Sequence, residues 1–260
     1  MRLTVLGSAA SYPGAGRACA GHLVQHSGTA VLLDCGNGVI SNLGRVIDPT
    51  HLAALFVSHG HIDHFADIYA LQSALRYAPT GPMQPLPLHL PAGLFGRMQT
   101  VLGGHAADEL ASAFQVHEFE AGRSVEVGPL RVTPRRVEHA DEAYALVVEA
   151  EGRSMCYTSD TKAGEAVLEA ARGTDLLLAE ATMPPEFAGR APHMTPAEAA
   201  MLARDAGAGT LVLTHMWPTV DRQRARAEAA GIFDGQVAVA DEMDTFDIDR
   251  GRGRAAFARP

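Results

Sequence analysis

The segment 58–64, with the sequence SHGHIDH, places three imidazoles and one carboxylate within six residues. It directly follows residues 53–57 (AALFV), an apolar run short enough for a buried β-strand. A regular helix or strand cannot direct all four side chains at one point, but a turn at the end of a strand can. Imidazole and carboxylate ligands suit zinc, manganese or iron rather than calcium. The segment therefore predicts a transition-metal site.

Three further polar residues follow predicted strands in the same way, namely His139, Asp160 and His215. Polar side chains that each follow a buried strand can meet at one edge of a sheet. Together with the first cluster they make five histidines and two aspartates, too many for one tetrahedral zinc. Such a set fits two metal ions about 3.5–4 Å apart. Because two close dications repel each other, an anionic bridge is required, and Asp160 and a hydroxide are the natural bridges.

The elements that must position these residues alternate between strands and helices over the whole chain. Strands are predicted at 2–7, 22–26, 29–34, 53–57, 86–90, 115–119, 123–127, 130–137, 143–149, 153–158, 175–179, 210–214, 236–239 and 244–248. Helices are predicted at 37–47, 67–77, 93–113 with a break at its two glycines, 163–171, from 196 to either Gly207 or Gly209, and 220–230. The segment 195–198 (TPAE) is a capping box with proline at the first helical position. Two sheets covered by helices on their outer faces would bury these strands.

The composition limits the classes of function. The chain has 260 residues, 47% of them hydrophobic, so it can bury a sizeable core, and its net charge of -9 argues against a general nucleic-acid coat. Three widely separated cysteines exclude a disulfide scaffold. No signal peptide is recognised and no apolar run approaches about 18 residues, so we expect a cytoplasmic protein that does not enter a membrane. We expect one domain over residues 1–249, followed by a flexible basic tail, 250–260.

The metal motif resembles that of the metallo-β-lactamase fold superfamily, in its ribonuclease Z-like branch, which includes small bacterial phosphodiesterases. The H-x-H-x-D-H signature is matched by His59, His61, Asp63 and His64. The resemblance implies an α/β fold, a four-layer αββα sandwich of two mixed sheets with helices on the outer faces. It implies two divalent metal ions per chain, zinc in the first instance, with manganese or iron as alternatives. The implied ligands are His59, His61 and His139 for one ion, Asp63, His64 and His215 for the other, and Asp160 as the bridge. Asp34 is implied to brace the metal loop.

A second part of the resemblance concerns the reaction. Residues 192–195 (PHMT) and 180–182 (EAT) match segments of the ribonuclease Z-like enzymes. The match implies that His193 contacts the scissile phosphate and that Glu180 orients it. Such a pairing would raise the pKa of the imidazole, and the resulting cation would stabilise developing charge or protonate the leaving oxygen. Asp63, His193 and Glu180 are therefore the predicted catalytic residues, with a chemically inert helix-capping histidine as the alternative for His193.

The predicted function is hydrolysis of small phosphodiesters, such as cyclic nucleotides, by a metal-bridging hydroxide. In ribonuclease Z, insertions that grip tRNA commonly lie between the third ligand strand and the bridging aspartate. Here only about 20 residues separate His139 from Asp160, enough for a hairpin. The alternatives are a tRNA 3′-end endonuclease acting on RNA, a thioester or lactone hydrolase, and a metal-binding structural protein. The resemblance also suggests a homodimer. Trp217 either lines the substrate mouth or wedges the end of a strand.

Overall fold

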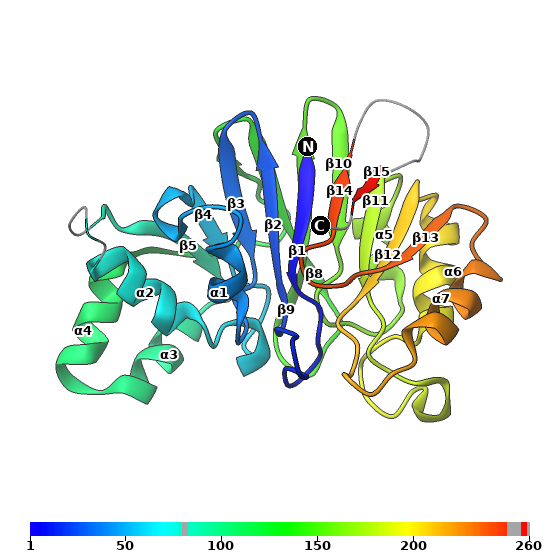
Figure 1. Ribbon diagram of the computed structural model, residues 1–260, viewed down its shortest axis with the longest axis horizontal. Coiled ribbons are helices and arrows are strands. Elements are labelled where there is room, and N and C mark those ends of the chain that lie inside the picture. The colour runs from blue at the N-terminus through cyan, green and yellow to red at the C-terminus, as the bar shows by residue number, and fades with distance from the viewer. Residues whose placement is uncertain (78, 80–82, 249–255, 259–260) are drawn as a thin grey trace.

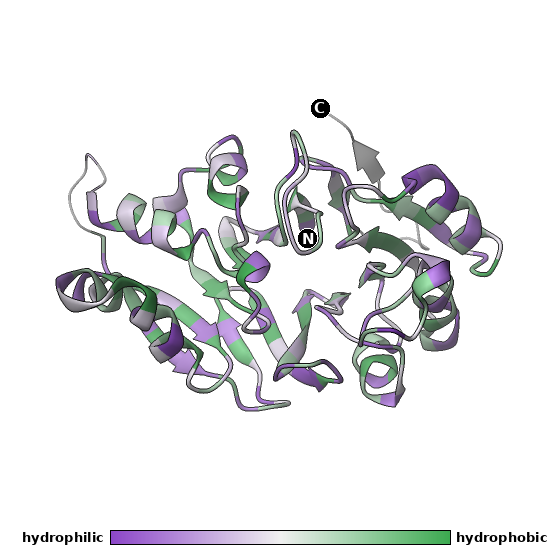
Figure 2. Ribbon diagram, turned by 90° about the horizontal axis from the view of Figure 1, so that it is seen from below, coloured by the Kyte–Doolittle hydropathy of each residue, from purple (hydrophilic) through white to green (hydrophobic). Residues whose placement is uncertain are grey.

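Two β-sheets face each other at the centre of the molecule, with one group of helices outside each sheet (Figures 1 and 2). The computed structural model describes residues 1–77, 79, 83–248 and, for the backbone, 256–258. The eight-stranded sheet has the order β15-β14-β1-β2-β3-β4-β5-β6, and the seven-stranded sheet has the order β13-β12-β11-β10-β9-β8-β7. Each sheet mixes parallel and antiparallel pairs. The αββα sandwich predicted from the sequence is confirmed.

The strands of the first sheet are β1 (Arg2–Gly7), β2 (Gly21–His26), β3 (Thr29–Leu33), β4 (Ala54–Phe56), β5 (Leu86–Leu90), β6 (Phe114–Glu118), β14 (Thr245–Asp247) and β15 (Ala256–Ala258). Those of the second are β7 (Val125–Val127), β8 (Leu130–Val137), β9 (Ala143–Ala150), β10 (Arg153–Tyr157), β11 (Leu176–Glu180), β12 (Thr210–Thr214) and β13 (Gln236–Val239). The helices beside the first sheet are α1 (Val39–Leu43), α2 (Ile68–Tyr77), α3 (Leu94–Leu102) and α4 (Gly104–Ala113). Beside the second sheet are α5 (Glu165–Ala171), α6 (Pro196–Ala206) and α7 (Arg222–Ala230). Short 3₁₀ turns are η1 (Pro49–His51), η2 (Ile62–His64) and η3 (Pro185–Phe187).

Burial on both faces explains why the central strands are continuous apolar runs. In β4, Phe56 packs into the core between the two sheets, whereas Leu55 packs against the helices of the first sheet. In β11, Leu178 faces the core between the sheets and Leu177 faces the helices of the second sheet. Successive side chains of a strand point to opposite faces, so a strand that is buried on both faces needs apolar residues at every position.

The capping box predicted at the start of α6 is confirmed. Thr195 Oγ1 accepts a hydrogen bond from Glu198 N at 3.2 Å, and Glu198 Oε2 accepts one from Thr195 N at 2.7 Å. The helix ends at Gly207, whose positive φ of 67° favours glycine. This fixed helix start holds the segment that carries His193.

One helix differs from its sequence expectation. The helix expected over 37–47 is reduced to the five residues of α1, because Gly38 lies in the left-handed region with a φ of 90° and residues 44–46 continue as turns rather than as helix. In the tail, Ala256–Ala258 pair with β14 as strand β15, the rest of the tail lies outside the described residues, and its flexibility stays a prediction. Among the described helices, none is both long and apolar enough to cross a membrane.

Candidate metal centre

Loops from distant parts of the sequence meet at one end of the sandwich. The connections that follow β1, β11 and β12 lie together at its lower end in Figure 1. The four ligand atoms of His59, His61, His139 and Asp160 lie within 4.8 Å of one another. Those of Asp63, His64 and His215 do so as well. The structure thus brings all seven predicted ligands into one cluster, while their role as ligands stays a prediction.

The spacing within the cluster matches the edges of a coordination shell. His61 Nδ1 lies 3.2 Å from His139 Nε2, and His64 Nε2 lies 3.1 Å from His215 Nε2. Asp63 Oδ2 is 3.3 Å from His215 Nε2. Two ligands bound tetrahedrally to zinc at about 2.0–2.1 Å would be about 3.3 Å apart. The donor atoms are therefore close enough to share a metal ion.

Hydrogen bonds to the outer ring nitrogens leave lone pairs directed at the cluster. His64 Nδ1 donates to Asp34 Oδ2 at 2.7 Å, and His139 Nδ1 donates to the Pro192 carbonyl at 3.1 Å. Thr182 donates its hydroxyl to the His215 carbonyl at 2.8 Å, so its Oγ1 can accept from His215 Nδ1, also at 2.8 Å. With Nδ1 protonated in each case, Nε2 is the free ligand atom. Nε2 of His64 and Nε2 of His215 lie 3.1 Å apart, and a metal ion or a proton between them would remove the repulsion of their lone pairs.

Two buried atoms of the cluster have no hydrogen-bond partner among the described residues, His59 Nε2 and Asp160 Oδ1. A buried polar atom without a partner costs free energy, so each such atom needs an explanation. Asp160 Oδ2 lies 3.7 Å from His59 Nε2 and 3.3 Å from His64 Nε2, one residue of each predicted ligand set. Burial raises the pKa of Asp160, but the neighbouring His215 and His64 outweigh it and hold the carboxyl ionised. A carboxylate in this place suits a bridge between two ions.

Asp34, which directly follows β3 of the first sheet, braces the metal loop through hydrogen bonds. It is fully buried and accepts hydrogen bonds from Ser58 N at 2.7 Å and from Ser58 Oγ and Tyr157 Oη at 2.8 Å, besides that from His64. Its φ of 60° is uncommon for a residue other than glycine, which indicates that the surrounding contacts fix the backbone there. The partners Tyr157 and Thr182 were not assigned from the sequence, because neither residue type nor spacing indicates that they reach the cluster.

His193 lies beside the cluster and is paired with Glu180. His193 Nδ1 donates to Glu180 Oε1 at 2.9 Å, and its ring centroid is 4.9 Å from that of His139. Glu180 is fully buried and also accepts from Thr161 N at 2.8 Å and Thr182 N at 3.1 Å. Burial lowers the pKa of His193, but the hydrogen bond and charge of Glu180 outweigh it and raise the pKa above its ordinary value.

The family model described as "Beta-lactamase superfamily domain" matches residues 29–216 of the chain. The chain belongs to the beta-lactamase superfamily. It is 33% identical to the uncharacterized protein Rv1339 of Mycobacterium tuberculosis, with 96% of this chain and 93% of that protein aligned. It is 28% identical to ribonuclease Z of Methanosarcina acetivorans, over 94% of this chain and 97% of the relative.

A solved structure of the same superfamily superimposes closely. The crystal structure of the metallo-beta-lactamase fold protein YhfI from Bacillus subtilis has a TM-score of 0.85 and 28% identity, covering 95% of this chain and 99% of the other. YhfI is named a probable metallo-hydrolase. Together with the His/Asp cluster, these relatives identify the chain as a metal-dependent hydrolase of this superfamily.

The bracing role of Asp34 gives a first testable prediction. Asp34→Asn should lower metal affinity by about 10–100-fold, because the amide no longer offers a full carboxylate to His64 Nδ1. Metal affinity is measured by competition with a chromophoric chelator. Tyr157→Phe is the matched control, since it removes one hydrogen bond to Asp34 and leaves the His64 contact in place. Equal affinity in the wild type and Asp34→Asn would show that Asp34 serves packing alone.

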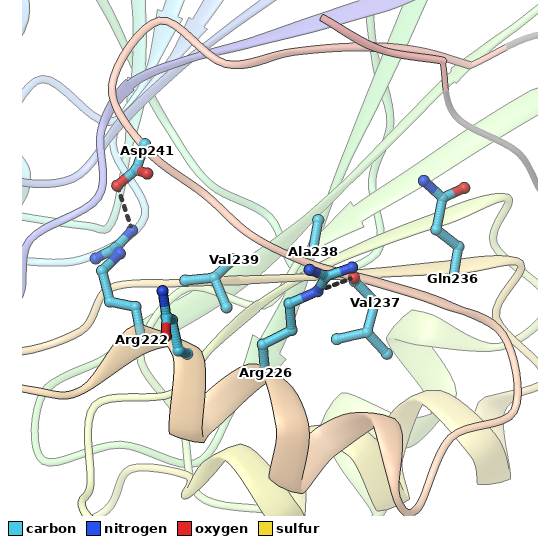
Figure 3. A pocket seen from close by; sticks show the side chains of 8 residues that line it. Arg222, Arg226, Gln236, Val237, Ala238, Val239 and Asp241 are labelled. Atoms are coloured by element: carbon cyan, nitrogen blue, oxygen red, sulfur yellow. Dashed lines mark hydrogen bonds and ion pairs between the residues drawn. The ribbon is translucent and has the colours of Figure 1, made fainter. Parts of the chain in front are cut away.

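A pocket of about 620 Å³ lies against α7 and β13 (Figure 3). Arg222 and Arg226 extend from α7 toward it, but both are engaged. Arg222 Nη2 is 3.3 Å from Asp241 Oδ1, and Arg226 Nε donates to the Val237 carbonyl at 3.1 Å. None of the described residues lining this pocket belongs to the seven predicted ligands, so it is not part of the superfamily's metal centre.

Proposed function

We propose that this metal-dependent hydrolase is a dinuclear phosphodiesterase that acts on small phosphodiesters such as cyclic nucleotides. The observation that carries the proposal is the pair of His193 and Glu180, with Nδ1 and Oε1 2.9 Å apart, beside the cluster. An imidazole held by a buried carboxylate next to a metal site can stabilise or protonate the leaving oxygen of a phosphodiester. The likeness to ribonuclease Z supports a phosphodiester as the bond that is cleaved.

The residues present fit two divalent ions, with zinc as the first choice. One ion would be held by His59, His61, His139 and Asp160, the other by Asp63, His64, His215 and Asp160. Bound there, the ions would neutralise phosphoryl oxygens and lower the pKa of the attacking water. A closed structural site uses four ligands, so this larger set favours catalysis over a structural role.

The protein's own groups set the direction of His193. Because His193 Nδ1 donates to Glu180, Nε2 is the ring nitrogen left for the substrate, and it is a donor when the ring is a cation. Backbone N–H groups of Thr161 and Thr182 hold the Glu180 carboxylate in place. His193 is mostly buried, with 15% of its side chain exposed, so its proton is directed at a small region of space. Within the proposal, that region is where the leaving oxygen lies.

The size of the substrate is the second part of the proposal. Between His139 and Asp160 the chain forms only the hairpin of β9 and β10, and the net charge is -9. Neither feature supplies a basic platform for tRNA. We expect a higher kcat/KM for small phosphodiesters than for precursor tRNA at physiological salt. The measurement is a hydrolysis panel on zinc-loaded protein with bis(p-nitrophenyl) phosphate, cyclic nucleotides, precursor tRNA, a thioester and a β-lactam.

The similarity to ribonuclease Z supports one second candidate function, which the same hydrolysis panel tests. Efficient cleavage of precursor tRNA at a single site would overturn the proposal in favour of a tRNA 3′-end endonuclease. Turnover confined to the thioester, or to a lactone added to the panel, would replace the phosphodiester by an acyl bond. Turnover of cyclic nucleotides above that of all other substrates would support the proposal in its narrowest form.

A further inference from the structure

A pocket of about 350 Å³ lies between η3, the start of α6, the segment after β12 and α7, and none of its lining residues is a predicted ligand. Trp217 lines it two residues beyond His215, and two residues of extended chain span at most about 7 Å. Pro196, three residues beyond His193, lines it as well, and so does Phe187 from η3. The pocket is therefore built on the two loops that carry His193 and His215.

Two aromatic rings determine what this pocket can bind. The ring centroids of Phe187 and Trp217 are 6.1 Å apart at an interplanar angle of 60°, and both side chains are only half-buried. The Arg190 guanidinium lies over the Phe187 ring, 4.9 Å from its centroid, a cation–π contact that favours one ring orientation. Pro185 and Pro196 add further apolar surface. Such surfaces suit a flat π-system better than a second phosphate.

Charged residues along the same pocket further limit the chemical class of ligand that it can bind. Glu186 and Glu228 are among the residues that line it, together with Arg224. Carboxylates repel additional phosphate groups, and they accept hydrogen bonds from exocyclic amino groups. The volume of about 350 Å³ lies in the range of small-molecule sites, about 300–1,000 Å³. The chemistry therefore fits a neutral, flat ring that carries an amino group.

We infer that this pocket binds the nucleobase of a substrate whose phosphodiester lies at the metal centre. Phe187 and Trp217 are then specificity-determining residues, and Glu186 or Glu228 accepts from the amino group of the base. Stacking on aromatic side chains tolerates different bases, because every base has a π-face. The inference rests on the proposed phosphodiesterase function and adds the chemical class of the group attached to the phosphate.

The chain contains a single tryptophan, so intrinsic fluorescence excited at the indole reports on this pocket directly. Zinc-loaded protein is titrated with adenosine monophosphate and, separately, with ribose 5-phosphate, which has the same phosphate without a base. We expect saturable quenching by adenosine monophosphate at concentrations where ribose 5-phosphate has no effect. Phe187→Leu should weaken adenosine monophosphate binding about tenfold. An equal response to both phosphates would overturn the inference, as would unchanged binding in Phe187→Leu.

A kinetic experiment separates this inference from the proposed function. The kcat/KM for the p-nitrophenyl ester of adenosine monophosphate is divided by that for methyl p-nitrophenyl phosphate. Phe187→Leu and Trp217→Leu should lower this ratio about tenfold, mainly through KM, and Trp217→Phe should restore it. Tyr77→Leu is the control, because Tyr77 is an exposed aromatic residue of α2, and α2 and α7 lie at opposite sides of the molecule (Figure 1).

The possible failures are distinct. If the wild type cleaves neither diester, the phosphodiesterase proposal fails. If it cleaves both and the ratio is the same in Phe187→Leu, Trp217→Leu and Tyr77→Leu, the metal centre hydrolyses phosphodiesters and the nucleobase pocket is refuted.

Discussion

Replacing Asp160 by alanine is expected to remove most of the bound metal and to lower hydrolysis by at least about 10³-fold. Asp160 Oδ2 lies 3.3 Å from His64 Nε2 and 3.7 Å from His59 Nε2, so one substitution affects both predicted ligand sets. Metal ions supply several kcal/mol of transition-state stabilisation, and each 1.36 kcal/mol corresponds to a tenfold change in rate. His59→Ala should retain more metal, because His59 belongs to one set.

Elemental analysis of protein purified without chelator measures the expected change. The wild type should hold about two ions per chain, and Asp160→Ala clearly fewer than His59→Ala. Asp175→Asn is a matched control, since this carboxylate binds Arg153 at 2.7 Å at the other end of the same sheet. Circular dichroism confirms that each variant is folded. A wild-type value that stays near one ion after zinc is supplied would contradict the dinuclear centre.

The parts of the fold that the sequence predicts are those buried on two faces. Strands β4, β11 and β12 are apolar at almost every position because the core and the helices both contact them. The metal residues follow the ends of such strands, so sequence position alone indicates that they meet. By contrast, α1 spans five residues where eleven were expected, since Gly38 precedes it with a φ of 90°, a left-handed conformation that no hydrophobic pattern indicates.

Sequence patterns do not predict the contacts between loops. Ser11, in the loop after β1, donates its N–H to Asp63 Oδ2 at 2.6 Å, so this loop borders the cluster. Neither residue type nor spacing in the sequence indicates this contact. The same holds for the rings of Phe187 and Trp217, which come from loops 30 residues apart. Strand β15 could not be inferred from the tail, because its pairing with β14 depends on an available sheet edge.

His193→Ala is expected to lower turnover of unactivated phosphodiesters by about 10²–10⁴-fold while metal content and folding stay nearly unchanged. His139 and His215 already complete the predicted ligand sets. His193 Nδ1 is hydrogen-bonded to Glu180 and lies 3.9 Å from Asp160 Oδ2. The segment around it is held by the capping box of α6, which the substitution does not touch. The ring is thus available for the substrate, and the hydrogen bond and charge of Glu180 raise its pKa, which favours the protonated form.

The dependence on the leaving group distinguishes proton donation from a structural role. For a p-nitrophenyl ester the loss in His193→Ala should be much smaller, because p-nitrophenolate leaves without protonation. Glu180→Gln should show the same pattern in a milder form, since its amide oxygen still accepts from His193 Nδ1 but no longer carries the charge that raises the pKa. Initial rates on both ester types, together with metal content and thermal melting, are measured for each variant. Loss of metal in His193→Ala would make His193 a ligand, since His193, Asp160 and His215 also place their ligand atoms within 4.8 Å of one another. Unchanged turnover of the unactivated diester would reduce His193 to a helix-start residue and remove the observation on which the phosphodiesterase proposal rests.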